Sequence, residues 1–193
     1  MENISLYDLI KKNRSCRRFN ESFKIKEEIL KSLINLARLS ASASNLQPLK
    51  YIVSINQKKN ENIFSCLKWA AHLKDWKGPE NGEKPSAYIV ILGDKTITKN
   101  FMCDHGIAAQ SILLGAREIG LAGCMLAAIN HKKLRDFLNI DNTFDILLVI
   151  ALGKPVEQVK ITKLDKDTKY WRDENNVHYV PKRDLNDIII SCS

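Results

Sequence analysis

The apolar run ILLVIAL, residues 146–152, constrains the fold more than any other part of the sequence. It is far shorter than the roughly 20 apolar residues that a membrane-spanning helix needs. An uninterrupted run of this length is typical of a strand that is buried on both faces. A second run, AYIVILG at residues 87–93, predicts another interior strand. Two such strands need cover on both sides, and we expect helices to supply it.

Three segments have the spacing of apolar residues that predicts helices. The first follows Ser5, a candidate N-cap, and ends at Asn13. The second spans residues 26–39 and carries its apolar side chains on one face, which we expect to face the core. The third, residues 104–119, is small and apolar on nearly every face, so it is expected in the middle of the fold, with Gly120 as its stop.

Shorter elements account for most of the remaining chain. They are a strand at 51–55, a helix at 61–71, an exposed and mobile loop at 74–85, and then strand, helix and strand at 124–129, 131–138 and 145–153. Helices and strands follow one another without regular βαβ alternation. The sequence therefore predicts an α+β fold, with a mixed β-sheet covered by helices on both faces, in a single domain over residues 1–193.

Charge and cysteine usage limit the classes of function. The net charge of +8 favours anionic partners, but charge alone does not separate a nucleic acid from a membrane surface or a phosphorylated small molecule. Charges interrupt the opening stretch MENISLYDLIKK, which argues against a secretory leader. The five cysteines are odd in number and form no C-x-x-C pair, so reduced thiols are expected. We expect a cytoplasmic protein without a membrane segment.

The segment NRSCRRF, residues 13–19, lies in the most basic part of the chain. Between residues 11 and 26 there is one acid, Glu21, against seven basic side chains: Lys11, Lys12, Arg14, Arg17, Arg18, Lys24 and Lys26. Guanidinium groups match phosphate oxygens, and Ser15 adds a hydroxyl, so a phosphate-binding segment is one interpretation. A solvated helix end is the other. A nucleic-acid patch is disfavoured, because the run lacks interleaved aromatic residues and a helix-turn-helix or RNP signature.

A second polar cluster, SASASNLQPLKYIV at residues 40–53, reads as a loop followed by a strand. Asn45 and Gln47 carry both donors and acceptors, which suits the edge of a planar heterocycle. A turn capped by Ser44 and Asn45 explains the same residues without a ligand. Neither G-x-G-x-x-G nor the P-loop signature occurs in the chain, so dinucleotide-binding and P-loop folds are not indicated.

Taken together, these segments resemble the FMN-dependent nitroreductase family. Its R-R-S-x-R-x-F motif falls on residues 13–19, with Asn13 in place of the usual basic residue. Its A-P-S-S-x-N-x-Q-P-W loop falls on residues 40–49, with Ala41 and Leu49 as departures. The segment GLAGC at residues 120–124, followed by LGKP, completes a resemblance that runs from residue 13 to about 185.

The resemblance implies a set of flavin contacts. Arg14, Ser15 and Arg17 would bind the phosphate and the ring edge of FMN. The loop that carries Ser42, Asn45 and Gln47 would contact the isoalloxazine from the partner subunit. The small residues Ala122 and Gly123 would lie close to the flavin ring, although a helix stop followed by a tight turn explains them without a ligand. The basic residues Lys182 and Arg183 of VPKRDL would return to the phosphate.

The same resemblance implies an NAD(P)H-dependent FMN oxidoreductase that works by a ping-pong cycle on a nitroaromatic, a quinone or a related small-molecule acceptor. It also implies an intertwined homodimer with flavin sites at the interface, in which residues 188–190 could form an exchanged arm or a local segment. Two other hypotheses stay open: a flavin-binding or storage module with little turnover, and a nucleic-acid-binding protein. Arg17 would stand near the flavin ring and favour its reduction.

The histidines do not indicate a metal. His72, His105, His131 and His178 fall in different segments and lack the spacing of metal ligands. We expect Cys103 to pack in the core and Asp104 to cap the following helix, which would leave no Cys–His couple with His105.

Overall fold

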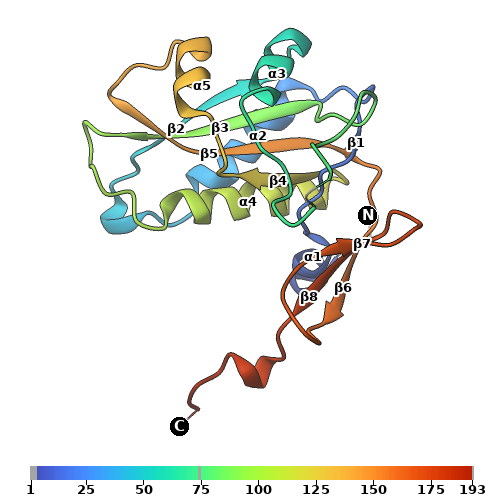
Figure 1. Ribbon diagram of the computed structural model, residues 1–193. Coiled ribbons are helices and arrows are strands. Elements are labelled where there is room, and N and C mark those ends of the chain that lie inside the picture. Colours follow the sequence, from blue (N-terminus) through green and yellow to red (C-terminus); the bar gives the residue numbers. More distant parts are fainter. Residues whose placement is uncertain (1–3, 74, 193) are drawn as a thin grey trace.

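The computed structural model describes residues 4–73 and 75–192. Its centre is a five-stranded sheet built on β5 (Phe144–Pro155), the longest strand (Figure 1). One edge of β5 pairs with β3 (Ala87–Asp94), which pairs in turn with β2 (Leu49–Ser54). Along its other edge, β5 pairs first with β4 (Ala122–Leu126) and, near its C-terminal end, with β1 (Phe19–Asn20). These pairings are antiparallel.

The two apolar runs form the adjacent strands β3 and β5, as the sequence predicts. All eight residues of β3 are buried. Side chains alternate between the faces of a strand. Ile89 and Ile150 therefore point into the core cluster on one face of the sheet, whereas Val90 and Val149 point into the cluster on the other.

Helices cover both faces of this sheet (Figure 1). On one face lie α2 (Glu27–Arg38) and α4 (Asp104–Glu118), and on the other lie α3 (Gln57–Phe64) and α5 (His131–Leu138). The predicted α+β fold with helices on both faces is confirmed. Gly120 ends α4 with a φ of 76°, as expected. None of the helices in the described ranges is long and apolar enough to cross a membrane.

Two predicted segments differ from the structure. The helix expected at 61–71 begins at Gln57, because the Asn56 side chain caps it by accepting the Lys59 N–H, and it ends at Phe64. The loop expected at 74–85 is irregular and partly buried, since Gly78 packs against Trp69. Lys74, which belongs to that loop, lies outside the described residues.

The C-terminal region forms a second, three-stranded sheet beside α1 (Leu6–Lys12), below the main body in Figure 1. Its order is β6 (Val159–Lys163), β8 (His178–Lys182) and β7 (Trp171–Arg172). β6 and β8 run parallel, whereas the described pairings of the main sheet are antiparallel, so the prediction that the helix-covered sheet is mixed was wrong. Residues 188–190 follow as an exposed tail.

Candidate functional site

The segment 13–19 runs from the end of α1 to the edge of the main sheet. Asn13 caps α1 by donating its N–H to the Leu9 carbonyl oxygen. The Cys16 N–H donates to the Gly123 carbonyl oxygen at 3.0 Å. Phe19 is fully buried opposite Pro155, and a Cβ on Gly153 would lie 2.8 Å from its ring. The segment is therefore fixed against β4 and β5.

Arg18 has a structural role. Its guanidinium donates to both carboxylate oxygens of Glu83, at 2.6 and 2.7 Å. This pairing raises the pKa of Arg18 and lowers the pKa of Glu83. Arg18 thus joins the segment to the loop before β3 and has few free donors for a ligand.

Arg14 lines a cavity of about 350 Å³ between α1, α4 and β6. Its Nη2 donates to the Ile10 carbonyl oxygen at 2.8 Å, whereas its buried Nε has no partner in the described part of the chain. Burial lowers the pKa of Arg14. Four further basic side chains line the cavity: Lys11, Lys12, Arg117 and Lys160. Because Glu157 is the one acidic residue among those lining it, the cavity suits an anion.

Arg17 is buried, and its guanidinium lies over the ring of Tyr170, 5.0 Å from the ring centre. Its Nε and Nη1 are buried without a hydrogen-bond partner among residues 4–73 and 75–192. Ser15 is exposed, and its side chain lies near the Cys124 thiol together with that of Arg17. Burial raises the pKa of Cys124, which is therefore a neutral thiol.

A buried carboxylate, Glu157, holds the backbone of this segment. Its Oε2 accepts the Arg17 main-chain N–H at 2.8 Å, and its Oε1 accepts Nη2 and Nε of Arg172 at 2.5 and 3.1 Å. The Arg172 guanidinium lies 4.3 Å from the centre of the Trp76 ring. Glu157 therefore links the segment to β7 and to the loop before β3.

His178 packs against the same carboxylate, with its Nδ1 3.8 Å from Glu157 Oε1. Burial lowers the pKa of His178 to about 4, and the positive charges of Arg17 and Arg172 act in the same direction, against the pull of Glu157. His178 is therefore neutral at pH 7. The Tyr170 ring lies between His178 and His72, with ring centres 5.1 and 4.9 Å away.

Sequence reasoning missed this cluster, which we call the Glu157 cluster: Glu157, Arg172, His178, Tyr170 and Trp76. The histidines were compared with metal-ligand spacing, and within the described ranges no group of three or more His, Cys, Asp or Glu side chains is arranged to hold a metal. The available signal was the aromatic and charged stretch YWRDENNVHY in an otherwise polar tail.

The loop with Ser42 is anchored on the first residue of α4. Asp104 is buried, and its carboxylate accepts the Ser42 hydroxyl at 2.6 Å and the Ala43 N–H at 2.9 Å. The expectation for this helix start was wrong: Asp104 binds the loop, and Cys103 is exposed rather than in the core. The negative charge of Asp104 is better satisfied by two donors than by capping its own helix.

The backbone of this loop is strained. Ser44, Asn45 and Gln47 have φ values of 50°, 54° and 51°, which non-glycine residues seldom adopt. The Gln47 Nε2 lies 3.2 Å from two oxygens of Asn45, and both side chains are exposed. The structure therefore brings Ser42, Asn45 and Gln47 together in one exposed loop.

Helix α4 separates this loop from the segment 13–19 (Figure 1). Asp104 is its first residue, whereas Arg117, in its last turn, lines the cavity with Arg14. Fifteen helical residues span roughly 22 Å at 1.5 Å per residue. The two predicted halves of the flavin site therefore lie at opposite ends of a helix within one chain.

The remaining predicted residues fall in two places. Ala122 is buried and lines the cavity beside Arg14. Gly123 has no space for a side chain, because a Cβ would lie 2.5 Å from the Ala151 carbonyl oxygen, so packing alone accounts for it. Lys182 and Arg183 lie at the exposed end of β8, away from His178, beside the Lys163–Asp184 ion pair. One copy of the chain does not bring them to Arg14 or Arg17.

Comparison with known proteins gives a family match. The family model described as "Nitroreductase family" matches residues 10–154. A Bacillus subtilis (strain 168) protein, MhqN, whose name gives NAD(P)H nitroreductase as a provisional activity, is 25% identical over 187 residues, covering 76% of this chain and 86% of its own. The iodotyrosine deiodinase of Thermotoga neapolitana is 23% identical over 191 residues, covering 90% and 97%.

Solved structures show the same fold. The nitroreductase family protein of Streptococcus pneumoniae TIGR4 superposes with a TM-score of 0.69 at 16% identity, covering 97% of this chain and 100% of that one. The FMN-dependent nitroreductase of Clostridium difficile R20291 gives a TM-score of 0.64 at 23% identity, covering 84% and 92%. At these identities the likeness establishes the fold alone.

Proposed function

This chain belongs to the nitroreductase family, and we propose that it is an FMN-dependent oxidoreductase that takes electrons from NAD(P)H and passes them to a small acceptor in a ping-pong cycle. The observation that carries the proposal is that three guanidinium nitrogens are buried without a partner in the described chain: Arg14 Nε, Arg17 Nε and Arg17 Nη1. Buried donors without partners cost free energy, so they are expected to meet acceptors in a ligand.

The residues of the segment fit FMN. A phosphate and the carbonyl oxygens of a flavin ring are acceptors that match guanidinium donors, and the Ser15 hydroxyl adds a donor on the same segment. The basic cavity that Arg14 lines favours a phosphate over a neutral group. When bound, FMN would supply the electron transfer. The chain would bind and orient it, with Glu157 holding the Arg17 backbone in place.

A second copy of the chain would complete the site. Ser42 and Asn45 lie at the far end of α4 from Arg14, so we propose that the loop of one protomer meets the segment 13–19 of its partner. The exposed apolar side chains of α1, Leu6, Tyr7 and Ile10, support an interface that one copy leaves uncovered. The exposed tail Ile188–Ile190 is an additional candidate for contact with the partner.

The acceptor is proposed at the level of class. Names among the relatives point to nitro compounds and, for the Thermotoga neapolitana protein, to an iodinated tyrosine. We therefore propose a nitroaromatic or a quinone as the acceptor class, and the panel to be tested should include iodotyrosine.

The test is the visible absorption spectrum of the purified protein, taken before and after heat release of the bound chromophore and then after addition of NADH or NADPH without air. A flavin spectrum that bleaches and recovers on addition of an acceptor is expected. A flavin spectrum that does not bleach would favour a storage module instead. A colourless protein that fails to take up added FMN would contradict the proposal.

The dimer has its own test. Light scattering after size-exclusion chromatography is expected to give twice the 22.0 kDa mass of one chain. A species with the mass of one chain that still holds FMN with full affinity would contradict a site completed by a partner.

A further inference from the structure

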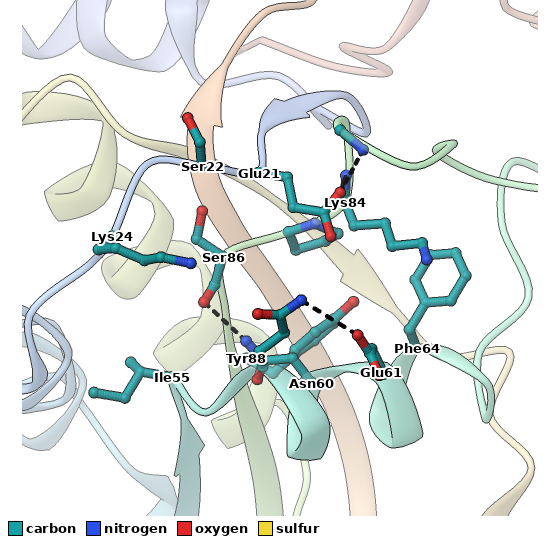
Figure 2. A pocket seen from close by; sticks show the side chains of 13 residues that line it. Glu21, Ser22, Lys24, Ile55, Asn60, Glu61, Phe64, Lys84, Ser86 and Tyr88 are labelled. Carbon is teal, nitrogen blue, oxygen red and sulfur yellow. Dashed lines mark hydrogen bonds between the residues drawn. The ribbon is translucent and has the colours of Figure 1, made fainter.

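A separate cavity of about 310 Å³ lies between α3, the turn after β1 and the segment that leads into β3 (Figure 2). Its floor holds Asn60, Pro85 and Tyr88, and its rim holds Lys24 and Lys84. None of its lining residues belongs to the segment 13–19 or to the loop that carries Ser42. The cavity is therefore a feature distinct from the flavin site proposed above.

The floor carries two buried polar atoms without partners. Asn60 is 8% exposed and Tyr88 is 1% exposed. Asn60 Nδ2 donates to the Ser86 carbonyl oxygen at 2.9 Å, which fixes the orientation of the amide and leaves Oδ1 as a free acceptor. Tyr88 Oη also has no partner within the described residues. Because nearly all buried polar atoms in proteins are hydrogen-bonded, two such atoms on residues that line one cavity favour a polar ligand there.

Charge is distributed unevenly in this cavity. Burial of the ring raises the pKa of Tyr88, and the negative charge of the nearby Glu21 adds to this shift. The Glu21 carboxylate is held in place by the Gly82 N–H. At the rim, Lys24 and Lys84 form no ion pair with any described residue. The floor therefore favours a cation or donor, and the rim favours an anion.

The walls add an apolar surface. Ile55, Phe64 and Pro85 line the cavity, and the Lys84 ammonium lies 5.3 Å from the centre of the Phe64 ring (Figure 2). At the rim, Gln57 Nε2 donates a hydrogen bond to Glu61 Oε1 at 3.4 Å. A ligand that fills this space needs a donor end, an acidic end and an apolar part.

We propose that the cavity binds a small zwitterion, specifically a free α-amino acid with an apolar side chain. Its ammonium group would meet Asn60 Oδ1, Tyr88 Oη and the charge of Glu21. Its carboxylate would meet the ammonium of Lys24, because the Lys84 ammonium already lies over the Phe64 ring. Its side chain would pack against Phe64. Binding here is non-covalent and does not depend on the flavin, so it goes beyond the oxidoreductase function and is tested without any measurement of activity.

Isothermal titration calorimetry with three matched probes tests the ligand class. The proposal predicts saturable binding of L-phenylalanine, one molecule per chain. Hydrocinnamate lacks the ammonium and phenethylamine lacks the carboxylate, so each should bind at least about tenfold more weakly. Absence of L-phenylalanine binding, or equal affinity for the three probes, would overturn the proposal. Binding of inorganic phosphate in place of L-phenylalanine would overturn it too.

Two variants place the binding at this cavity. Tyr88→Phe removes one hydroxyl and should weaken L-phenylalanine binding about fivefold, while the melting temperature stays level or rises, because a buried hydroxyl without a partner is lost. Lys24→Gln changes an exposed residue and should weaken binding by a similar factor, whereas the matched Lys26→Gln should not. Unchanged affinity in both Tyr88→Phe and Lys24→Gln would refute the site.

Discussion

The β3–β5 pair and the Glu157 cluster are both buried, yet they are stabilised in opposite ways. In the strand pair, the backbone groups bond to each other and the side chains that fill the space are almost all apolar. In the cluster and the adjoining Arg17, a carboxylate, two guanidinium groups and an imidazole lie close together. Buried charges stabilise a protein little unless each is fully paired.

The difference indicates where the fold is complete by itself. The strand pair needs no charged partner, since its side chains are almost all apolar, and its one unpartnered buried polar atom among the described residues, Tyr88 Oη, belongs to the separate cavity described above. In the cluster, both nitrogens of His178 have no hydrogen-bond partner in the residues that the structure describes, and neither do Nε and Nη1 of the adjoining Arg17. We infer that the strand pair makes the fold and that the cluster positions a ligand-binding segment.

The largest effect should come from the strand pair. Ile150→Ala removes a fully buried side chain from β5 and should lower the free energy of unfolding by about 4 kcal/mol. The matched change Ile161→Ala, on half-exposed β6, should lower it by less than about 1 kcal/mol. Urea unfolding of the two variants measures both values. Equal losses would mean that the two sheets contribute alike.

The second-largest effect should be a loss of stability of the cluster in acid. The pKa of His178 is about 4 in the folded chain against 6.5 for a free histidine, so the unfolded chain binds more protons between these values. Stability from this group is complete above pH 6.5 and is lost as the pH falls towards 4, by on the order of 3 kcal/mol.

Urea unfolding at a series of pH values measures this loss. His178→Gln should flatten the dependence between pH 6.5 and 4, whereas His131→Gln, at an exposed position on α5, should keep it. A wild-type protein whose stability does not change over this range would show that His178 is not neutral in the fold.

A smaller effect is expected from the carboxylate itself. Glu157→Gln keeps the shape but removes the charge that Arg172 pairs with, which should cost about 2 kcal/mol. The loss should be local. Hydrogen exchange should speed up in β6, β7 and β8 while β3 and β5 stay protected. Glu174→Gln, on an exposed turn, is the control, and uniform acceleration across both sheets would contradict a local role.

The smallest effect on stability is expected from two serines, of which one has a hydrogen-bond partner and the other has none in the described chain. Ser42→Ala removes the hydroxyl that donates to Asp104 and should lower the free energy of unfolding by about 1 kcal/mol. Ser54→Ala removes a buried hydroxyl that lacks a partner in the described chain, so it should be neutral or stabilising. Thermal melts compare the two. If Ser54→Ala lost as much stability as Ser42→Ala, hydrogen-bond partners would not decide how much a serine hydroxyl contributes to the free energy of unfolding.

The sequence predicts the apolar half of this comparison well and the polar half poorly. Residues 87–93 and 131–138 carry their structure in local pattern, so β3 and α5 follow directly from it. Asp104 shows the opposite case. Its partner Ser42 is 62 residues away in the sequence, and no local sequence pattern predicts that contact. The nearest rule, capping, gave the wrong role.

The candidate site divides in the same way. The segment 13–19 has a recognisable order of residue types, and the structure buries Arg17 and the Nε atom of Arg14. Glu157, Arg172 and His178 come from separate places in the tail, and tertiary packing alone brings them to Arg17. Whether Lys182 and Arg183 reach a flavin depends on a partner protomer and stays a prediction.

FMN affinity tests the central claim most directly, because it reports on the free donors of Arg17. Flavin fluorescence titration of the flavin-free protein should give a dissociation constant at least about tenfold higher for Arg17→Gln than for wild type. Lys132→Gln, an equal change of charge on exposed α5, should stay within about twofold. If Arg17→Gln instead binds FMN as tightly as wild type, the unpaired donors of Arg17 do not hold the flavin and the proposed site is wrong.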